Sequence, residues 1–197
     1  MTLTKSIARV ALATAFFLLV PLLAKQFNPE MAWTLFDFAA AGTLLFGAGL
    51  AYVLVARIGG SNAYRLAVGV AVGVALLLVW ANLAVGLIGN ENDPANLLYG
   101  GVLAVLLIGA LVAHFQPSGM TNALFATAFA QMVVPVIALL VGKSQIAAAE
   151  AALGGGVVQM IGGNIFFAAL WAGAALLFRR ASATGSSSDQ RLAHPQR

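Results

Sequence analysis

The chain has 197 residues, of which 61% are hydrophobic and only 8% charged, and its mean hydropathy is +0.96. Because soluble domains carry about one quarter charged residues, this composition excludes a soluble globular protein and indicates a chain surrounded by lipid. There is no cysteine, which excludes disulfides, iron–sulfur clusters, thiolate zinc sites and a cysteine nucleophile. The net charge of +4 comes largely from arginines beside apolar stretches, which indicates contact with anionic lipid rather than with nucleic acid.

Six apolar stretches follow one another along the chain, each long enough to supply the roughly 20 residues with which a helix crosses a bilayer. They cover residues 7–24, 32–56, 66–89, 97–114, 123–142 and 157–178. We therefore predict an all-α fold, an integral membrane bundle of about six transmembrane helices that occupies residues 1–180. Residues 181–197 are rich in Ser, Gly and Gln, cannot bury a core, and are predicted to form a disordered cytoplasmic tail.

Capping residues predict where several of these helices begin. Asn28-Pro29 and Asp93-Pro94 each place a capping side chain before a proline that suits the first helical position. The second and fourth helices should therefore begin there. Ser61, after two glycines, is the expected cap of the third helix.

Basic residues divide unevenly between the two ends of the predicted spans. One end carries eight of them, and the other carries two: Lys5, Arg9, Arg57, Arg65, Arg179, Arg180, Arg191 and Arg197 against Lys25 and Lys143. Because Lys and Arg are retained in the cytoplasm, this division predicts that both termini are cytoplasmic. The first span has an alternative interpretation as a cleaved signal peptide, since basic residues precede its apolar run. Leu22, the third position before a cut after Ala24, is not small, which favours retention.

Few polar side chains fall inside the spans, and each marks a helix contact or a functional site because polar groups are unfavourable in lipid. The main ones form a candidate intramembrane polar cluster: Asp37, Asn82, Asn164 and Gln131. Each shares a helical face with alanine or glycine, so these faces should point into the bundle. At about 1.5 Å of rise per residue, the four crowd the outer half of the membrane. Two interpretations stay open: interhelical hydrogen bonds that fix packing, or a polar pocket open to the outside.

Asp37 is the only acid within a span and the strongest single candidate for a functional residue. An ionised carboxylate in lipid must find a partner, face water or take up a proton. Lys25 and Lys143 are candidate partners on the same side. An equally open alternative is an interfacial acid that reaches the outer surface one turn below Trp33.

No motif for catalysis, a metal or a cofactor is evident. The loop at residues 90–96 gathers oxygen atoms, but it lacks the spacing and the glycine of an EF-hand, and Asp93 is explained as a helix cap. His114 and His194 are too far apart to ligate a membrane haem as a pair. The glycines at 154–156 precede a span and not a dinucleotide-binding helix, and we find no P-loop or nucleophile elbow. We therefore predict a protein that is not an enzyme, with no catalytic residues, no metal and no cofactor.

Two segments resemble an uncharacterised group of small bacterial multi-pass membrane proteins. They are WANLAVGLIGNENDPANLLY at residues 80–99 and WTLFDF at residues 33–38. The resemblance covers the second to fifth spans and implies a bacterial cytoplasmic (inner) membrane, but it carries no activity.

The sequence thus favours an accessory or structural membrane protein, with a small-solute or ion transporter or binder that uses an outward-facing polar pocket as the alternative. The expected partners are the lipid bilayer and, through small-residue faces, other membrane proteins or a second copy of the chain. Such faces occur at Gly69 and Gly73 in the third span and at Ala169 and Gly173 in the sixth. No nucleic-acid partner is expected.

Overall fold

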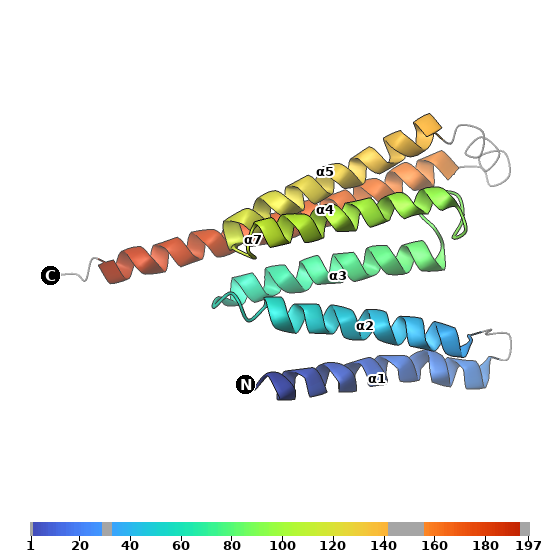
Figure 1. Cartoon of the computed structure of the whole chain (residues 1–197), viewed down its shortest axis with the longest axis horizontal. Coiled ribbons are helices and arrows are strands. Elements are labelled where there is room, and N and C mark those ends of the chain that lie inside the picture. The colour runs from blue at the N-terminus through green and yellow to red at the C-terminus, as the bar shows by residue number, and fades with distance from the viewer. Residues whose placement is uncertain (1, 29–32, 142–155, 194–197) are drawn as a thin grey trace. The chain divides into compact units, whose positions relative to one another are not determined.

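The computed structural model describes residues 2–28, 33–141 and 156–193, with side chains as far as residue 183, and Figure 1 shows its helices. These are α1 (Leu3–Phe27), α2 (Leu35–Val55), α3 (Asn62–Ala84), the short 3-10 helix η1 (Pro94–Leu97), α4 (Leu98–Val112), α5 (Pro117–Val141) and α7 (Gly156–Ala193). No strand occurs within the described ranges. Six segments, with η1 and α4 counted as one, are long and apolar enough to cross a membrane. The predicted all-α fold with six membrane-length helices is confirmed.

Side-chain caps set the start of α3 and of η1, which leads into α4. The Ser61 hydroxyl accepts a hydrogen bond from the Tyr64 N–H at 3.1 Å, and Asp93 Oδ1 accepts one from the Ala95 N–H at 2.9 Å. Each cap satisfies an N–H group that the first turn of a helix leaves without an intrahelical partner. Both predicted caps are confirmed.

The predicted start of α2 is wrong. The helix begins at Leu35 and not at Asn28-Pro29, because Thr34 and Asp37 form a capping box in which each side chain accepts from the other's backbone N–H. Asn28 instead follows the last residue of α1 as its C-cap.

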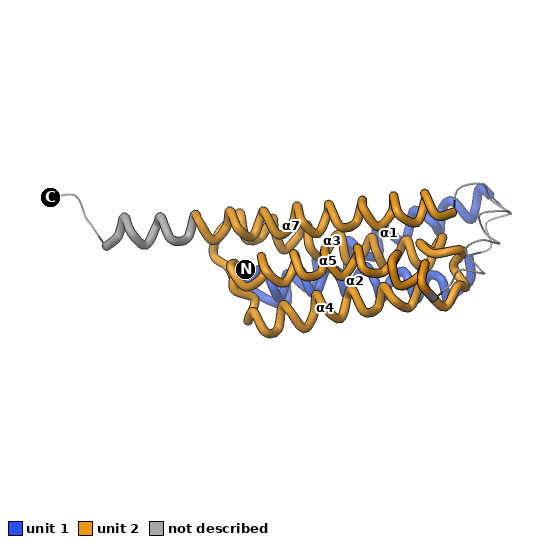
Figure 2. Tube along the Cα trace, turned by 90° about the horizontal axis from the view of Figure 1, so that it is seen from above, with its two compact units in different colours: residues 1–57 blue, residues 58–197 orange. Residues whose placement is uncertain are grey.

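The chain divides into two compact units, Met1–Arg57 (unit 1) and Ile58–Arg197 (unit 2), drawn in separate colours in Figure 2. The predicted organisation differs, since it places residues 1–180 in one bundle. The division lies in the turn between α2 and α3, where Gly59 and Gly60 precede the cap of α3. Unit 1 is the hairpin of α1 and α2, and unit 2 contains α3, η1, α4, α5 and α7.

Unit 1 is held by a close approach between α1 and α2 at two glycines. A Cβ added to Gly49 would lie 2.5 Å from Val10 Cγ1, and one added to Gly42 would lie 3.3 Å from Leu18 Cδ1. No residue of α1 is buried, and in α2 only Ala41 is. The contact therefore depends on the absence of a side chain at Gly42 and at Gly49, and such close approach at small residues is common between membrane helices.

Unit 2 has a continuous core along α5 and α7, which lie side by side and antiparallel (Figure 1). Buried residues recur at alternating intervals of three and four in both helices: Met120, Leu124, Thr127, Gln131, Val134 and Ala138 in α5, and Met160, Asn164, Phe167, Trp171, Ala174, Phe178 and Ala181 in α7. This heptad spacing is typical of helices that pack with side chains of one in the grooves of the other. In addition, α4 packs on α5, and α3 packs on α7.

The turn from α4 to α5 is tied to α3 by one tyrosine. Two consecutive residues of this turn, His114 and Phe115, have left-handed backbone conformations, with φ of 48° and 56°. The Tyr64 hydroxyl donates to the Phe115 carbonyl at 2.8 Å, and the Tyr64 ring meets the ring of Phe178 edge to face, with 5.4 Å between centroids. Tyr64 is 1% exposed, and its bond to the turn is partly buried.

The predicted disordered tail needs correction over residues 181–193, where α7 continues as a helix to Ala193. Ala181 is still buried, and the Ser182 hydroxyl donates to the Phe178 carbonyl at 3.1 Å, one turn back. The helix therefore carries its packed face to the end of its membrane-length segment, Gly156–Ala183. Three residues with roles considered above lie outside the described residues: Lys143, His194 and Arg197.

Candidate functional site

Four side chains from three helices of unit 2 form a hydrogen-bonded polar network: Tyr99 of α4, Gln131 of α5, and Asn164 and Trp171 of α7. Gln131 Nε2 donates to Asn164 Oδ1 at 3.0 Å. Asn164 Nδ2 donates to the Tyr99 hydroxyl at 2.9 Å and to the Met160 carbonyl at 2.8 Å. Trp171 Nε1 donates to Gln131 Oε1 at 3.4 Å. The network thus joins α4, α5 and α7 through side chains alone.

The polar network is fully enclosed by the protein. Gln131, Asn164 and Trp171 are 0% exposed, and Tyr99 is 2% exposed. A buried donor or acceptor that loses its partner costs about 1–3 kcal/mol, so each member depends on the others. The two amides bond each other, and their further bonds are to Tyr99, Trp171 and the Met160 carbonyl, so the network holds the three helices in one register.

The chemistry available to the polar network is limited to hydrogen bonding. Its groups are two amides, a phenol and an indole, and none of them is a carboxylate, imidazole or amine that could serve as a general base near neutral pH. Among the described residues, no group of three or more His, Cys, Asp or Glu side chains could hold a metal ion. The arrangement is therefore suited to positioning helices.

Of the four residues of the predicted cluster, the structure brings Gln131 and Asn164 together. Asn82 lies in α3, where it is half-buried and its Nδ2 donates to the Leu78 carbonyl of its own helix at 3.0 Å. Its Oδ1 is buried and has no hydrogen-bond partner within the described part of the chain. Asn82 therefore has one buried acceptor, Oδ1, that is not satisfied by the described part of the chain.

Asp37 lies in unit 1, where its carboxylate is part of the cap of α2. Asp37 Oδ2 accepts from the Thr34 N–H at 2.6 Å and from the Thr34 hydroxyl at 2.8 Å. The Asp37 N–H in turn donates to the Thr34 hydroxyl oxygen at 3.3 Å. Lys25, its candidate partner, donates from Nζ to the Trp33 carbonyl at 2.6 Å. The half-buried Asp37, at the first turn of α2, matches the interfacial alternative for this residue.

The loop at residues 90–96 is held by its own side chains. Asn96 Oδ1 accepts from the N–H groups of Leu87 at 3.1 Å and Ile88 at 3.0 Å. Asn96 Nδ2 donates to the carbonyls of Ile88 at 3.1 Å and Asn90 at 2.6 Å. The side-chain oxygens of Asn90, Asp93 and Asn96 thus accept from backbone N–H groups of the loop or of the residues just before it.

Sequence reasoning missed Tyr99 and Trp171 as members of the polar network. A signal for Trp171 exists, because it follows Asn164 by seven residues and so shares its helical face. A buried indole N–H needs an acceptor, and the face of α7 that carries Asn164 must contact a helix that offers one. Tyr99 carries no such signal, since a tyrosine at the end of a span is equally typical of the membrane interface.

Comparison of the chain with protein-family models, with curated proteins and with solved structures finds no match. The resemblance of residues 33–38 and 80–99 to small bacterial membrane proteins therefore stays a prediction.

Proposed function

We propose that this chain is an accessory or structural multi-pass protein of a bacterial cytoplasmic membrane and not an enzyme. The observation that supports this most directly is the complete burial of Gln131 and Asn164, whose amides bond each other. A site for a solute must leave donors or acceptors open to that solute, whereas Gln131 and Asn164 bond each other and are fully buried. In lipid, polar contacts of this kind hold helices together in a defined register. The four helices of unit 2 then act as a rigid scaffold.

The partner we propose for this scaffold is another membrane protein or a second copy of the chain. An added Cβ at Gly73 in α3 or Gly173 in α7 would meet no atom within 4 Å, so neither glycine is used for close packing within the chain. Small residues on an open helix face allow another helix to approach closely.

Purification of the tagged full-length chain in mild detergent tests this function. We expect a membrane protein or a second copy to be retained at a fixed ratio, and Gly173→Leu to reduce the retention while the thermal unfolding midpoint stays unchanged. The matched control is Gly100→Leu, because Gly100 in α4 is equally open but lies outside both small-residue pairs. A chain that purifies as a monomer in detergent and in lipid nanodiscs would refute the accessory role.

The proposed orientation has both termini in the cytoplasm, because the basic residues lie predominantly at that end of the helices. Reporter fusions test it. A fluorescent protein at the C-terminus should fluoresce, and alkaline phosphatase inserted after Asn90 should be active. Phosphatase activity from a fusion after Arg180 would reverse the orientation.

One observation favours a transporter or binder of a small solute or ion as the second candidate function. Asn82 Oδ1 is a buried acceptor without a partner within the described part of the chain, and such an atom offers a bond to a solute or water. If it serves a solute, Asn82→Leu should abolish binding or uptake and leave the unfolding midpoint in place. If Asn82 serves packing, the unfolding midpoint of Asn82→Leu should differ from that of the unmodified chain. In that case no added solute should shift the midpoint of the unmodified chain.

A further inference from the structure

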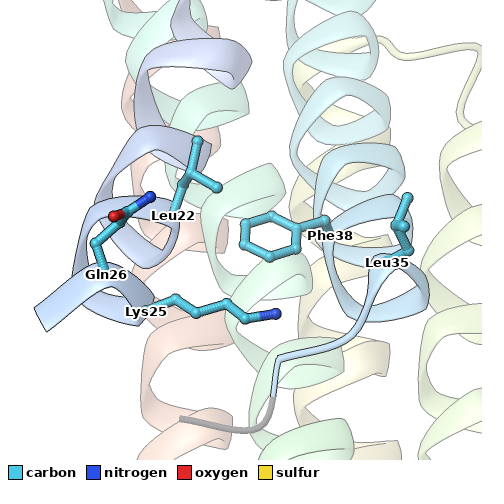
Figure 3. Close-up of a pocket in the computed structure, with 5 residues that line it drawn as sticks. All are labelled: Leu22, Lys25, Gln26, Leu35 and Phe38. Atoms are coloured by element: carbon cyan, nitrogen blue, oxygen red, sulfur yellow. The ribbon is translucent and has the colours of Figure 1, made fainter. Parts of the chain in front are cut away.

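Unit 1 contains a groove of about 690 Å³ between the end of α1 and the start of α2. The described residues that line it are Leu22, Lys25, Gln26, Leu35 and Phe38. Figure 3 shows that Leu22 faces the ring of Phe38 across the groove, and that Lys25 extends from α1 toward α2 below that ring. The groove therefore has apolar walls with a cation at one side.

The cation in the groove is held in place and still has donors for a ligand. An ammonium group has three hydrogen-bond donors, and among the described residues the acceptor for Lys25 Nζ is the Trp33 carbonyl at 2.6 Å. That bond keeps the lysine extended along the groove. Asp37 is the one acid within α1 and α2; its Oδ2 accepts from Thr34, and its carboxylate is also attracted electrostatically by Lys25. Among the described residues that line the groove, Lys25 is the charged one.

The apolar walls continue into the surface of the hairpin that would face lipid. Leu22 is 46% exposed and Leu35 is 90% exposed, and the ring of Trp33 packs edge to face on Phe38 with 5.2 Å between centroids. Because the groove lies where one membrane-length helix ends and the next begins, it sits at the depth of lipid headgroups if both helices span the bilayer. An amphiphile can then place its polar end at Lys25 and its chain along Leu22.

We propose that this groove binds an anionic phospholipid, whose phosphate contacts the Lys25 ammonium and whose acyl chain packs between Leu22 and Phe38. Charge supports an anionic occupant, since Lys25 is the one charged side chain among the described residues that line the groove. A lipid is the natural source of the phosphate because the walls of the groove are continuous with lipid-facing apolar surface. The site rests on the proposed membrane location but not on the scaffold role of unit 2.

Trp33 provides a reporter for the test, because its ring lies against Phe38. The full-length chain carrying Trp80→Phe leaves Trp33 and the fully buried Trp171 as its tryptophans. The chain is reconstituted in phosphatidylcholine vesicles, and quenching of its fluorescence is followed as brominated phosphatidylglycerol or brominated phosphatidylcholine replaces the host lipid. We expect about fivefold tighter apparent binding of the anionic lipid, as about 1 kcal/mol per lysine near a membrane surface implies.

Two charge-matched variants decide whether the preference belongs to the groove. Lys25→Gln should bring the two lipids to equal quenching, whereas Lys5→Gln, the same charge change near the other end of α1, should keep the preference. Phe38→Ala should weaken quenching by both lipids. Equal quenching by both lipids in the unmodified chain would identify ordinary lipid around the protein and overturn the proposal. An equal loss of the preference for anionic lipid in Lys25→Gln and Lys5→Gln would also overturn it. Either result would leave the scaffold role of unit 2 intact, since that role depends on the polar network.

Discussion

Units 1 and 2 are both built from membrane-length helices, yet they are held together in different ways. In unit 1, α1 and α2 approach at Gly49 and Gly42 and bury almost nothing. In unit 2, α5 and α7 share a heptad core, and the polar network adds bonds to α4. Lipid provides no hydrophobic driving force between helices, so packing and hydrogen bonds must supply the specificity. Unit 2 is therefore expected to resist change, and unit 1 to be the more adaptable part.

The largest expected effect contrasts a core aromatic residue of unit 2 with an exposed one of unit 1. Phe178 is 0% exposed and packs against Tyr64, whereas Phe16 in α1 is 67% exposed. Phe178→Ala should lower the free energy of unfolding by about 3 kcal/mol because it leaves a cavity. Phe16→Ala should change it by less than about 0.5 kcal/mol. Unfolding in mixed micelles of a mild and a denaturing detergent measures both, and equal losses would remove the distinction between the units.

A pair of glycine variants tests whether unit 1 depends on the close contact between Gly49 and Val10. Gly49→Leu should separate α1 from α2 because Val10 occupies the space its Cβ needs, at a cost of about 2 kcal/mol. Gly47→Leu is the matched control on the same helix, since an added Cβ there meets nothing within 4 Å. The chain has no cysteine, so spin labels can be attached at cysteines introduced for Leu12 and Leu54. Only Gly49→Leu should lengthen the distance between the labels, and unchanged distances in both variants would show that the hairpin is held elsewhere.

A smaller effect is expected at the tyrosine that ties the turn between α4 and α5. Tyr64→Phe removes the donor to the Phe115 carbonyl and keeps the ring contact with Phe178. The free energy of unfolding should therefore fall by about 1 kcal/mol. Tyr52→Phe in unit 1 is the control, because Tyr52 is 38% exposed. The thermal unfolding midpoint in detergent should fall for Tyr64→Phe alone. A midpoint that falls equally in both variants would indicate a general effect of the hydroxyl group.

The part of the fold that follows from membrane physics could be predicted from the sequence. Six apolar runs produce six helices because the length of a span is set by the bilayer. Gln131 and Asn164 stand out because an amide in an apolar run needs a partner. The start of α2 is harder to predict from the sequence. Thr34 with Asp37 and Asn28 with Pro29 are both plausible helix starts, and composition alone does not favour one over the other.

The remaining features depend on which helices are neighbours. Whether Tyr99 faces the headgroups or the core is decided by the position of α7, which places the Asn164 amide next to the Tyr99 hydroxyl. The division after Arg57 is likewise not evident from hydropathy, because α2 and α3 both carry a membrane-length apolar run. Residues 181–193 have a composition typical of disorder, yet the helix that precedes them extends through this region.

A double-mutant cycle on Gln131 and Asn164 tests most directly whether the polar network is what fixes unit 2. Each single change to leucine leaves a buried partner without its bond, whereas the double change removes both groups together. The account predicts that the double variant loses less free energy of unfolding than the sum of the single losses, with a coupling of about 0.6 kcal/mol or more. Losses that add within about 0.3 kcal/mol would mean that the bond between the two amides does not hold α5 to α7, and would contradict the account.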